Sequence, residues 1–201
     1  SAMLTSSASA VTIAISPDGR FFTLDGTPTF LNGVSYYAAQ SITTPSFVTQ
    51  DLDDMVANGF NWIRVWANWS GVAVTTHDGV IVEPYMSRFK TLIAECNSRG
   101  IIVDCTFDHA AAGTLAQHLA AVQTVAQQLL PYRNVYIDVG NERDVGDARY
   151  LSLPECGTLI SAIKVIDPQR VCTASSVPNS QSGLNDFKTI AKMDFIAPHL
   201  C

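Results

Sequence analysis

The sequence predicts an α/β fold built from consecutive βα units. Runs rich in β-branched and aromatic residues alternate with longer stretches whose apolar residues recur every three or four positions, which is typical of strands alternating with helices. The most informative run, residues 134–142, is an apolar strand that ends in Asn141 and Glu142. An amide and a carboxylate at the carboxyl end of such a strand indicate chemistry rather than packing, because α/β barrels keep their active sites there.

Six strands and five helices are expected in alternation. The strands lie at about 30–37, 62–68, 101–108, 134–142, 171–177 and 195–199. The helices lie at about 45–58, 84–99, 113–130, 159–166 and 185–193. Pro84 suits a first helical turn, while Gly59, Gly100 and Pro131 are typical of helix ends.

A β-hairpin is expected ahead of these units, at 11–24, because two short alternating runs flank the turn signal at 16–19. In a barrel such a hairpin plugs the floor. Residues 1–10 are expected to lie outside the fold, since 1–3 are typical of an expression scar and 4–10 form a lead-in rich in Ser and Ala. The domain is therefore expected to span 11–201.

Composition narrows the class of protein. With 201 residues, 47% hydrophobic and 15% charged, the chain has enough apolar residues for a large core, and no apolar run approaches the roughly 20 residues of a membrane span. A soluble, globular protein without membrane contact is expected. The net charge of -6 and the 12 scattered Lys and Arg residues argue against a nucleic-acid partner and favour a neutral ligand.

The cysteines show no spacing typical of a metal site, so no metal is expected. Most are expected to be buried small hydrophobic residues, although an odd count leaves at least one without a partner in the same chain. They are Cys96, Cys105, Cys156, Cys172 and Cys201.

Residues 22–37, residues 53–66 and the pair Asn141-Glu142 follow one another in an order that is more specific than any one of them. Together they resemble the opening strand, the first helix with the second strand, and the end of the fourth strand of the clan A retaining glycoside hydrolases, the cellulase-like and mannanase-like β-glycosidases. The resemblance runs from about residue 11 to the last residue. It implies a (β/α)8 TIM barrel, hydrolysis of a β-linked oligo- or polysaccharide with retention, and no cofactor.

Retaining glycosidases use two carboxyl groups about 5 to 5.5 Å apart, one as general acid and base and the other as nucleophile. The resemblance implies that Glu142 is the acid and base and that Asn141 hydrogen-bonds the sugar 2-hydroxyl. The alternative is that the pair only caps the following helix, with Asp144 or Asp147 completing its N-terminus.

Other candidate residues lie on neighbouring strands or at their ends. The resemblance implies that Arg64 orients the nucleophile, whereas the alternative is a structural ion pair with Asp104 or Asp108. Asp108 and His109 end the third strand, and His199 ends the sixth, at positions where the family often has a histidine. The residues expected to bind substrate are Arg64, Asp108, His109 and His199.

Aromatic residues near strand ends are candidates for stacking on sugar rings. Tyr37 and Trp66 are expected to bind substrate in this way, and Trp69 is a further candidate, although aromatics at strand ends are as often core residues. His77 and His118, in a loop and on a helix, are expected at the surface.

The nucleophile is expected to be absent from this chain. Of the four glutamates, only Glu142 ends a strand. The family carries its nucleophile after a seventh strand, so the barrel is expected to be truncated after the sixth, short of the roughly 250 residues of a full barrel. Two departures leave the subtype open, because Arg143 replaces a common Pro and Cys201 replaces a Tyr that contacts the nucleophile.

An open six-strand sheet exposes unpaired backbone groups at both edges. A homo-oligomer or a complementing C-terminal fragment is therefore expected to cover them and to deliver the missing carboxylate. Three alternatives stay open: an inactive or vestigial partial barrel that binds carbohydrate, Asp108 acting as nucleophile or as base for an inverting water, and a barrel that is not a glycosidase. Secretion is expected, because polymeric β-glycans lie outside cells.

Overall fold

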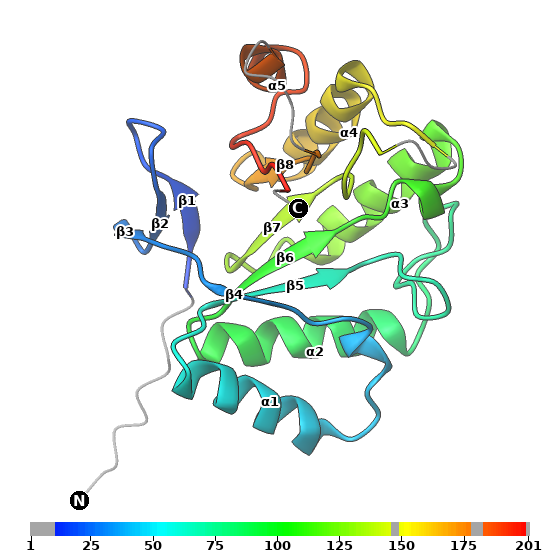
Figure 1. The fold of residues 1–201 in the computed structure, drawn as a ribbon. Coiled ribbons are helices and arrows are strands. Elements are labelled where there is room, and N and C mark those ends of the chain that lie inside the picture. The colour runs from blue at the N-terminus through cyan, green and yellow to red at the C-terminus, as the bar shows by residue number, and fades with distance from the viewer. Residues whose placement is uncertain (1–10, 146–148, 178–182, 200–201) are drawn as a thin grey trace, which may run out of the picture.

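The computed structural model describes residues 11–145, 149–177 and 183–199, so the expectation for residues 1–10 lies outside the described residues. A parallel sheet forms the centre of the fold (Figure 1). Its strands follow chain order and are β4 (Gly33–Ser35), β5 (Trp62–Trp66), β6 (Ile102–Thr106), β7 (Val135–Asp138) and β8 (Cys172–Thr173). The predicted α/β fold, a partial barrel of βα units with an N-terminal hairpin, is confirmed.

A helix follows each strand of the parallel sheet. They are α1 (Pro45–Ala57), α2 (Tyr85–Ser98), α3 (Leu115–Gln128), α4 (Leu153–Ile166) and α5 (Leu184–Thr189), with short 3-10 helices η1 (Ala39–Ser41) and η2 (Ala110–Ala112). Local sequence fixes their starts. Thr114 and Gln117 form a capping box at α3, Ser152 and Glu155 form another at α4, and Pro45 occupies the first turn of α1.

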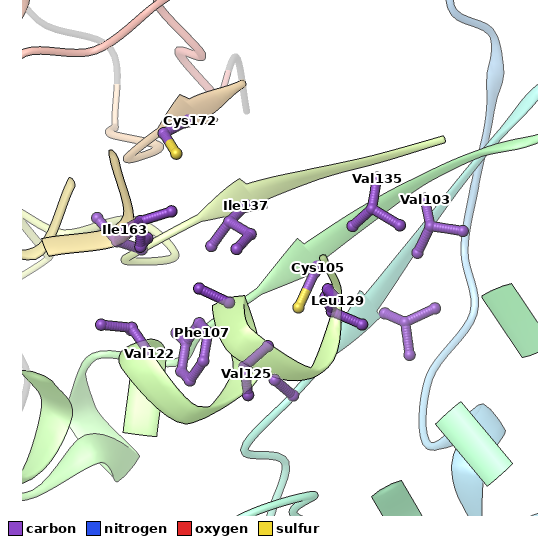
Figure 2. Packing of buried hydrophobic residues seen from close by; sticks show 14 of the residues in the cluster. Val103, Cys105, Phe107, Val122, Val125, Leu129, Val135, Ile137, Ile163 and Cys172 are labelled. Atoms are coloured by element: carbon purple, nitrogen blue, oxygen red, sulfur yellow. The ribbon is translucent and has the colours of Figure 1, made fainter. Parts of the chain in front are cut away.

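The helices cover one face of the sheet. Alternate strand residues such as Ile63, Val103 and Ile137 point toward this layer and belong to one buried apolar cluster with the helices (Figure 2). The four cysteines of the described residues are buried within it and free, in agreement with their expected role as small hydrophobic residues.

The hairpin lies at the end of the sheet where the parallel strands begin (Figure 1). Strands β1 (Ile13–Ile15), β2 (Phe22–Leu24) and β3 (Thr27–Thr29) form an antiparallel sheet. Phe22 stacks on Tyr136 with ring centroids 6.4 Å apart and meets Phe195 edge-on at 4.8 Å. The hairpin thus closes the floor as predicted. The third strand was not predicted, although Asp25 and Gly26, with φ of 50° and 81°, form the kind of turn that favours a hairpin.

Two local predictions are wrong. Residues 195–199 make a single parallel bridge, Ser176 with Pro198, rather than a sixth strand. The bridge consists of the two hydrogen bonds usual for parallel pairing, Ser176 N–H to Ala197 O at 3.1 Å and His199 N–H to Ser176 O at 2.7 Å.

The surface position predicted for His118 is also wrong, because its side chain is fully buried against Phe107. Its Nδ1 accepts a hydrogen bond of 3.1 Å from Arg149 Nη1. Burial lowers its pKa to about 3, and the Arg149 charge adds to this. His77 is exposed, as predicted. Within the described residues, no helix is both long and apolar enough to cross a bilayer.

The inner face of the sheet carries polar groups. The strand register pairs Asp104 with Arg64 on one side and with Tyr136 on the other. Two residues further along the strands, it pairs Thr106 with Asp138. Side chains two residues apart on a strand share a face. This alternation therefore brings charged residues from β5, β6 and β7 together on the face opposite the helices.

Candidate active site

The carboxyl end of β7 presents Asn141 and Glu142. Backbone hydrogen bonds to both neighbouring strands fix this turn, with Asn141 N–H donating to Phe107 O at 2.7 Å and Arg143 N–H donating to Ser175 O at 3.0 Å. Glu142 has a φ of 45°, in the left-handed region. That conformation costs a residue with a side chain about 1 to 2 kcal/mol, so surrounding contacts hold Glu142 in place.

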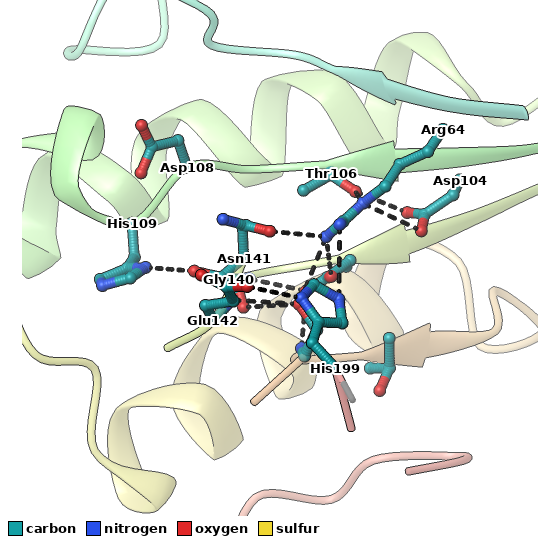
Figure 3. Close-up of polar contacts among 12 residues, drawn as sticks. Arg64, Asp104, Thr106, Asp108, His109, Gly140, Asn141, Glu142 and His199 are labelled. Carbon is teal, nitrogen blue, oxygen red and sulfur yellow. Dashed lines mark hydrogen bonds and ion pairs between the residues drawn. The ribbon is translucent and has the colours of Figure 1, made fainter. Parts of the chain in front are cut away.

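The Glu142 carboxyl group lies beyond the carboxyl end of β7 and is partly exposed. Its Oε1 is 3.0 Å from His199 Nδ1, and the side chains are 32% and 26% exposed respectively (Figure 3). Helix α4 begins at Leu153, and its cap is Ser152 with Glu155. The alternative that Asn141 and Glu142 only cap the next helix is therefore wrong.

Arg64 fixes the side chain of Asn141. Its Nη2 donates to Asn141 Oδ1 at 2.9 Å and to Asp138 Oδ2 at 3.0 Å. A guanidinium group only donates hydrogen bonds. The oxygen of the Asn141 amide therefore faces Arg64, and its Nδ2 group faces away from Arg64.

Arg64 also takes part in a buried ion-pair network. Its Nε donates to Thr106 Oγ1 at 2.8 Å and lies 3.5 Å from Asp104 Oδ2, while the residue is only 8% exposed. The expected alternative of an ion pair with Asp104 is thus present alongside the contact to Asn141. Burial and the nearby charge of Asp138 raise the pKa of Asp104 to about 7.

Asp108 and His109 follow β6 and differ in what they contact. His109 is buried, and its Nδ1 lies 2.6 Å from Asn141 O. Because a carbonyl oxygen only accepts hydrogen bonds, the Nδ1 of His109 is the donor. Asp108 Oδ1 accepts the Ala110 N–H at 3.0 Å, and its carboxylate points away from Glu142 in Figure 3. The structure therefore brings His109 to the Asn-Glu turn but does not bring the Asp108 carboxylate there.

An aromatic cluster adjoins Arg64. Tyr37 stacks on Trp66 with centroids 4.6 Å apart, Trp69 meets both rings edge-on at 5.4 Å, and the Arg64 guanidinium lies 4.8 Å from the Trp66 centroid. Trp66 is 4% exposed and Tyr37 is 58% exposed. Of the two stacked rings, Tyr37 is therefore the exposed one, and the buried Trp66 ring packs against it.

The remaining glutamates have structural roles. Glu83 accepts the Ser87 N–H at 3.1 Å, Glu95 pairs with Arg99 at 2.6 Å, and Glu155 completes a helix cap. Within the described ranges no cluster of side chains suited to a metal ion occurs.

Two residues of the site were not identified from the sequence. Asp138 accepts Arg64, and Ser175 Oγ accepts the Glu142 N–H at 3.1 Å. The strict alternation in β7 was a usable signal for Asp138, because it places a carboxylate on the same face as Tyr136. Ser175 follows the short strand β8, where nothing in the pattern distinguishes it from its neighbour Ser176.

A parallel βα sheet with an Asn-Glu pair at the end of its fourth strand, an arginine on the second and histidines on either side defines a partial barrel of the glycoside hydrolase type. Residues 18–189 match the profile of the cellulase family, glycosyl hydrolase family 5. The chain belongs to this family.

Solved structures show the same fold. A family 5 glycoside hydrolase from Bacteroides vulgatus is 16% identical with a TM-score of 0.67, covering 84% of this chain and 40% of its own. An exo-β-1,4-mannosidase from Opitutaceae bacterium strain TAV5 is 17% identical with a TM-score of 0.70, covering 92% and 40%. An endocellulase from Pyrococcus horikoshii, solved with cellotetraose, is 15% identical with a TM-score of 0.61, covering 84% and 58%.

The chain therefore spans 40% to 58% of the length of these structures. No curated protein matches it significantly.

Proposed function

We propose that this chain is the part of a retaining β-glycosidase that carries the general acid and base, Glu142. The observation that carries the proposal is the contact of 3.0 Å between Glu142 and His199, beside an Asn141 that Arg64 holds by its oxygen. A carboxyl group that is partly exposed and oriented at the carboxyl end of a barrel strand is suited to exchange a proton with a bound ligand.

Each residue then has a role in the two steps of retention. Protonated Glu142 gives its proton to the glycosidic oxygen as the bond to the nucleophile forms, and the carboxylate later takes a proton from the attacking water. The Asn141 Nδ2 group donates to the sugar 2-hydroxyl. Tyr37, supported by Trp66 and Trp69, packs against a sugar ring.

The nucleophile is proposed to come from a segment outside this chain. Two other carboxylates on the inner face, Asp104 and Asp138, are 5% and 1% exposed and both contact Arg64. Neither is placed to attack a sugar carbon. A complementing C-terminal fragment would supply the nucleophile. Such a fragment, or a second copy of the chain, would also cover the edges of the sheet at β4 and at residues 195–199, which lie along β8.

The substrate class is proposed to be a β-linked glucan or mannan, which in the case of a polymer implies an extracellular site of action. The names of the similar structures, an endocellulase and an exo-β-1,4-mannosidase, support these two sugars. Glucose and mannose differ at the 2-hydroxyl, the group that Asn141 is proposed to bind.

Hydrolysis of cellotetraose and mannotetraose tests the proposal, after native mass spectrometry has established whether the 21.7 kDa chain occurs alone or in an assembly. The hydrolytic species should release the β-anomer first, as seen by proton NMR. Glu142→Gln should lower turnover by about 10² to 10⁴-fold, while Glu83→Gln, an exposed glutamate outside the site, should change it less than about twofold. Equal activity of the two variants would overturn the assignment.

A second function, carbohydrate binding without catalysis, is favoured by one observation. Within the described residues, no glutamate other than Glu142 closely follows a strand of the parallel sheet, because Glu83, Glu95 and Glu155 lie beside or within helices α2 and α4. Saturable binding of either sugar by a monomer that hydrolyses neither would favour this function.

A 2-fluoroglycoside inactivator locates the nucleophile. The proposal predicts that the sugar label is absent from this chain and present on a companion segment. A label on Asp108 would instead support its role as a substitute nucleophile.

A further inference from the structure

The backbone of Glu142 depends on one side chain from the neighbouring strand. Ser175 Oγ accepts the Glu142 N–H at 3.1 Å, and the carbonyl of the same residue accepts the next amide, Arg143 N–H, at 3.0 Å. Ser175 is 1% exposed. It therefore holds the backbone of Glu142 in its left-handed conformation from a buried position.

Asp138 ties Ser175 to the rest of the turn. Its Oδ1 accepts both the Gly140 N–H and the Ser175 N–H at 3.0 Å, and its Oδ2 accepts Arg64 Nη2 at 3.0 Å. Three donors satisfy this buried carboxylate, which makes it a rigid centre rather than a group that reacts.

Asp138 and Ser175 are linked by hydrogen bonds to Asn141, through Arg64, and to Glu142. Arg64 uses the same Nη2 atom for Asp138 and for Asn141 Oδ1, so the position of the Asn141 amide follows the position of Asp138. The position of Glu142 follows that of Ser175 in the same way. Asp138 and Ser175 are each 1% exposed, so neither side chain is available to a ligand.

We infer that Asp138 and Ser175 are positioning residues that jointly aim Asn141 and Glu142. The inference rests on the proposed function for its catalytic meaning. Its physical content, that the orientation of Glu142 is set by these two side chains, is open to a test that needs no turnover.

The four glutamates make the test selective, because protein labelled only with ¹⁵N,¹³C-glutamate gives four amide and four carboxyl signals. Glu142→Gln assigns the signals of Glu142. In Ser175→Ala, the Glu142 amide should exchange with solvent about five to ten times faster, as expected for the loss of one hydrogen-bond acceptor, and its carboxyl ¹³C signal should move. Asp138→Asn should move the same carboxyl signal.

Ser176→Ala is the matched control, because Ser176 is 2% exposed and bonds residues 197 and 199 through its backbone. It should leave the Glu142 amide exchange within about twofold of the wild type. Signals of the other three glutamates should stay in place in every variant.

Unchanged Glu142 signals in Ser175→Ala, or equal movement of all four glutamates, would overturn the inference. If Asp138→Asn does not fold, Ser175→Ala decides the question alone. Failure of the wild-type protein to hydrolyse or bind either tetrasaccharide would count against the proposed function and would leave this test intact. In a hydrolytic species, Ser175→Ala should lower kcat with little change in KM, and an unchanged kcat would also overturn the inference.

Discussion

His199 Nδ1 lies 3.0 Å from Glu142 Oε1, and the other nitrogen of the same ring, Nε2, lies 3.4 Å from Arg64 Nη1. Because a guanidinium only donates, Nε2 faces Arg64 as the acceptor, and Nδ1 carries the proton that it donates to Glu142. One imidazole ring therefore connects the arginine of β5 with the carboxyl group that follows β7.

This relationship predicts that His199 orients the Glu142 carboxyl group. His199→Ala should lower turnover of a β-linked tetrasaccharide by about 10²-fold, the effect expected when a reacting group is misplaced by about 1 Å. His77→Ala, at an exposed loop position, is the control and should leave turnover within about twofold. Equal rates for both variants would show that the contact does not orient Glu142.

Arg64 should contribute to stability as well as to the site. Arg64→Met leaves Asp104 and Asp138 buried without their cation, so the free energy of unfolding should fall by about 3 to 5 kcal/mol. Arg20, whose side chain is 78% exposed, provides the comparison, and Arg20→Met should change that free energy by less than about 0.5 kcal/mol. Urea unfolding measures both, and a loss below about 1 kcal/mol for Arg64→Met would contradict the network described here.

Asp104 should make stability depend on pH. Burial and the Asp138 charge raise its pKa from 3.8 to about 7, so between these values the folded state binds more protons than the unfolded state. Stability from this group is therefore fully present below about pH 4 and is lost as pH rises to 7, by at most about 1.4 kcal/mol per pH unit.

Asp104→Asn removes this titration. The unfolding free energy of the wild type should fall relative to that of Asp104→Asn as the pH rises from 4 to 7. Parallel curves for the two proteins over that range would contradict the raised pKa.

His118 should act in the opposite direction. Burial, aided by the Arg149 charge, lowers its pKa from 6.5 to about 3, so the unfolded state binds more protons between these values. Stability from the neutral ring is present above pH 6.5 and is lost as pH falls toward 3. His118→Gln should reduce this acid sensitivity in thermal unfolding at pH 4, and the same loss of stability in both proteins between pH 6.5 and 4 would contradict the assignment.

The sequence predicted the βα order well because long helices carry a strong periodic signal. On α2 the apolar residues that recur every three or four positions are buried, for example Met86, Phe89 and Ile93. The signal was weaker on α1, where Leu52 is buried but the neighbouring apolar residue Val56 is 43% exposed. Short strands were less predictable, because β8 has two residues and residues 195–199 form one bridge where strands were expected.

The residues of the site also fall into those that the sequence predicted and those that it did not. Arg64, Asn141 and Glu142 were named from their places in sequence motifs, and the structure brings them together with His109 and His199. The supporting residues were not named, because their roles depend on register between strands that lie far apart in the chain. Asp138 and Ser175, for instance, meet only through the pairing of β7 with β8.

The most direct test of the account is a titration of cellotetraose, and separately of mannotetraose, into the glutamate-labelled protein while the four carboxyl ¹³C signals are followed. If Glu142 faces the bound sugar, its signal should move in a saturable way with at least one of the two sugars, while those of Glu83, Glu95 and Glu155 stay fixed. A Glu142 signal that moves with neither sugar, or four signals that move alike, would contradict the claim that the Asn141-Glu142 pair is a glycoside-binding catalytic site.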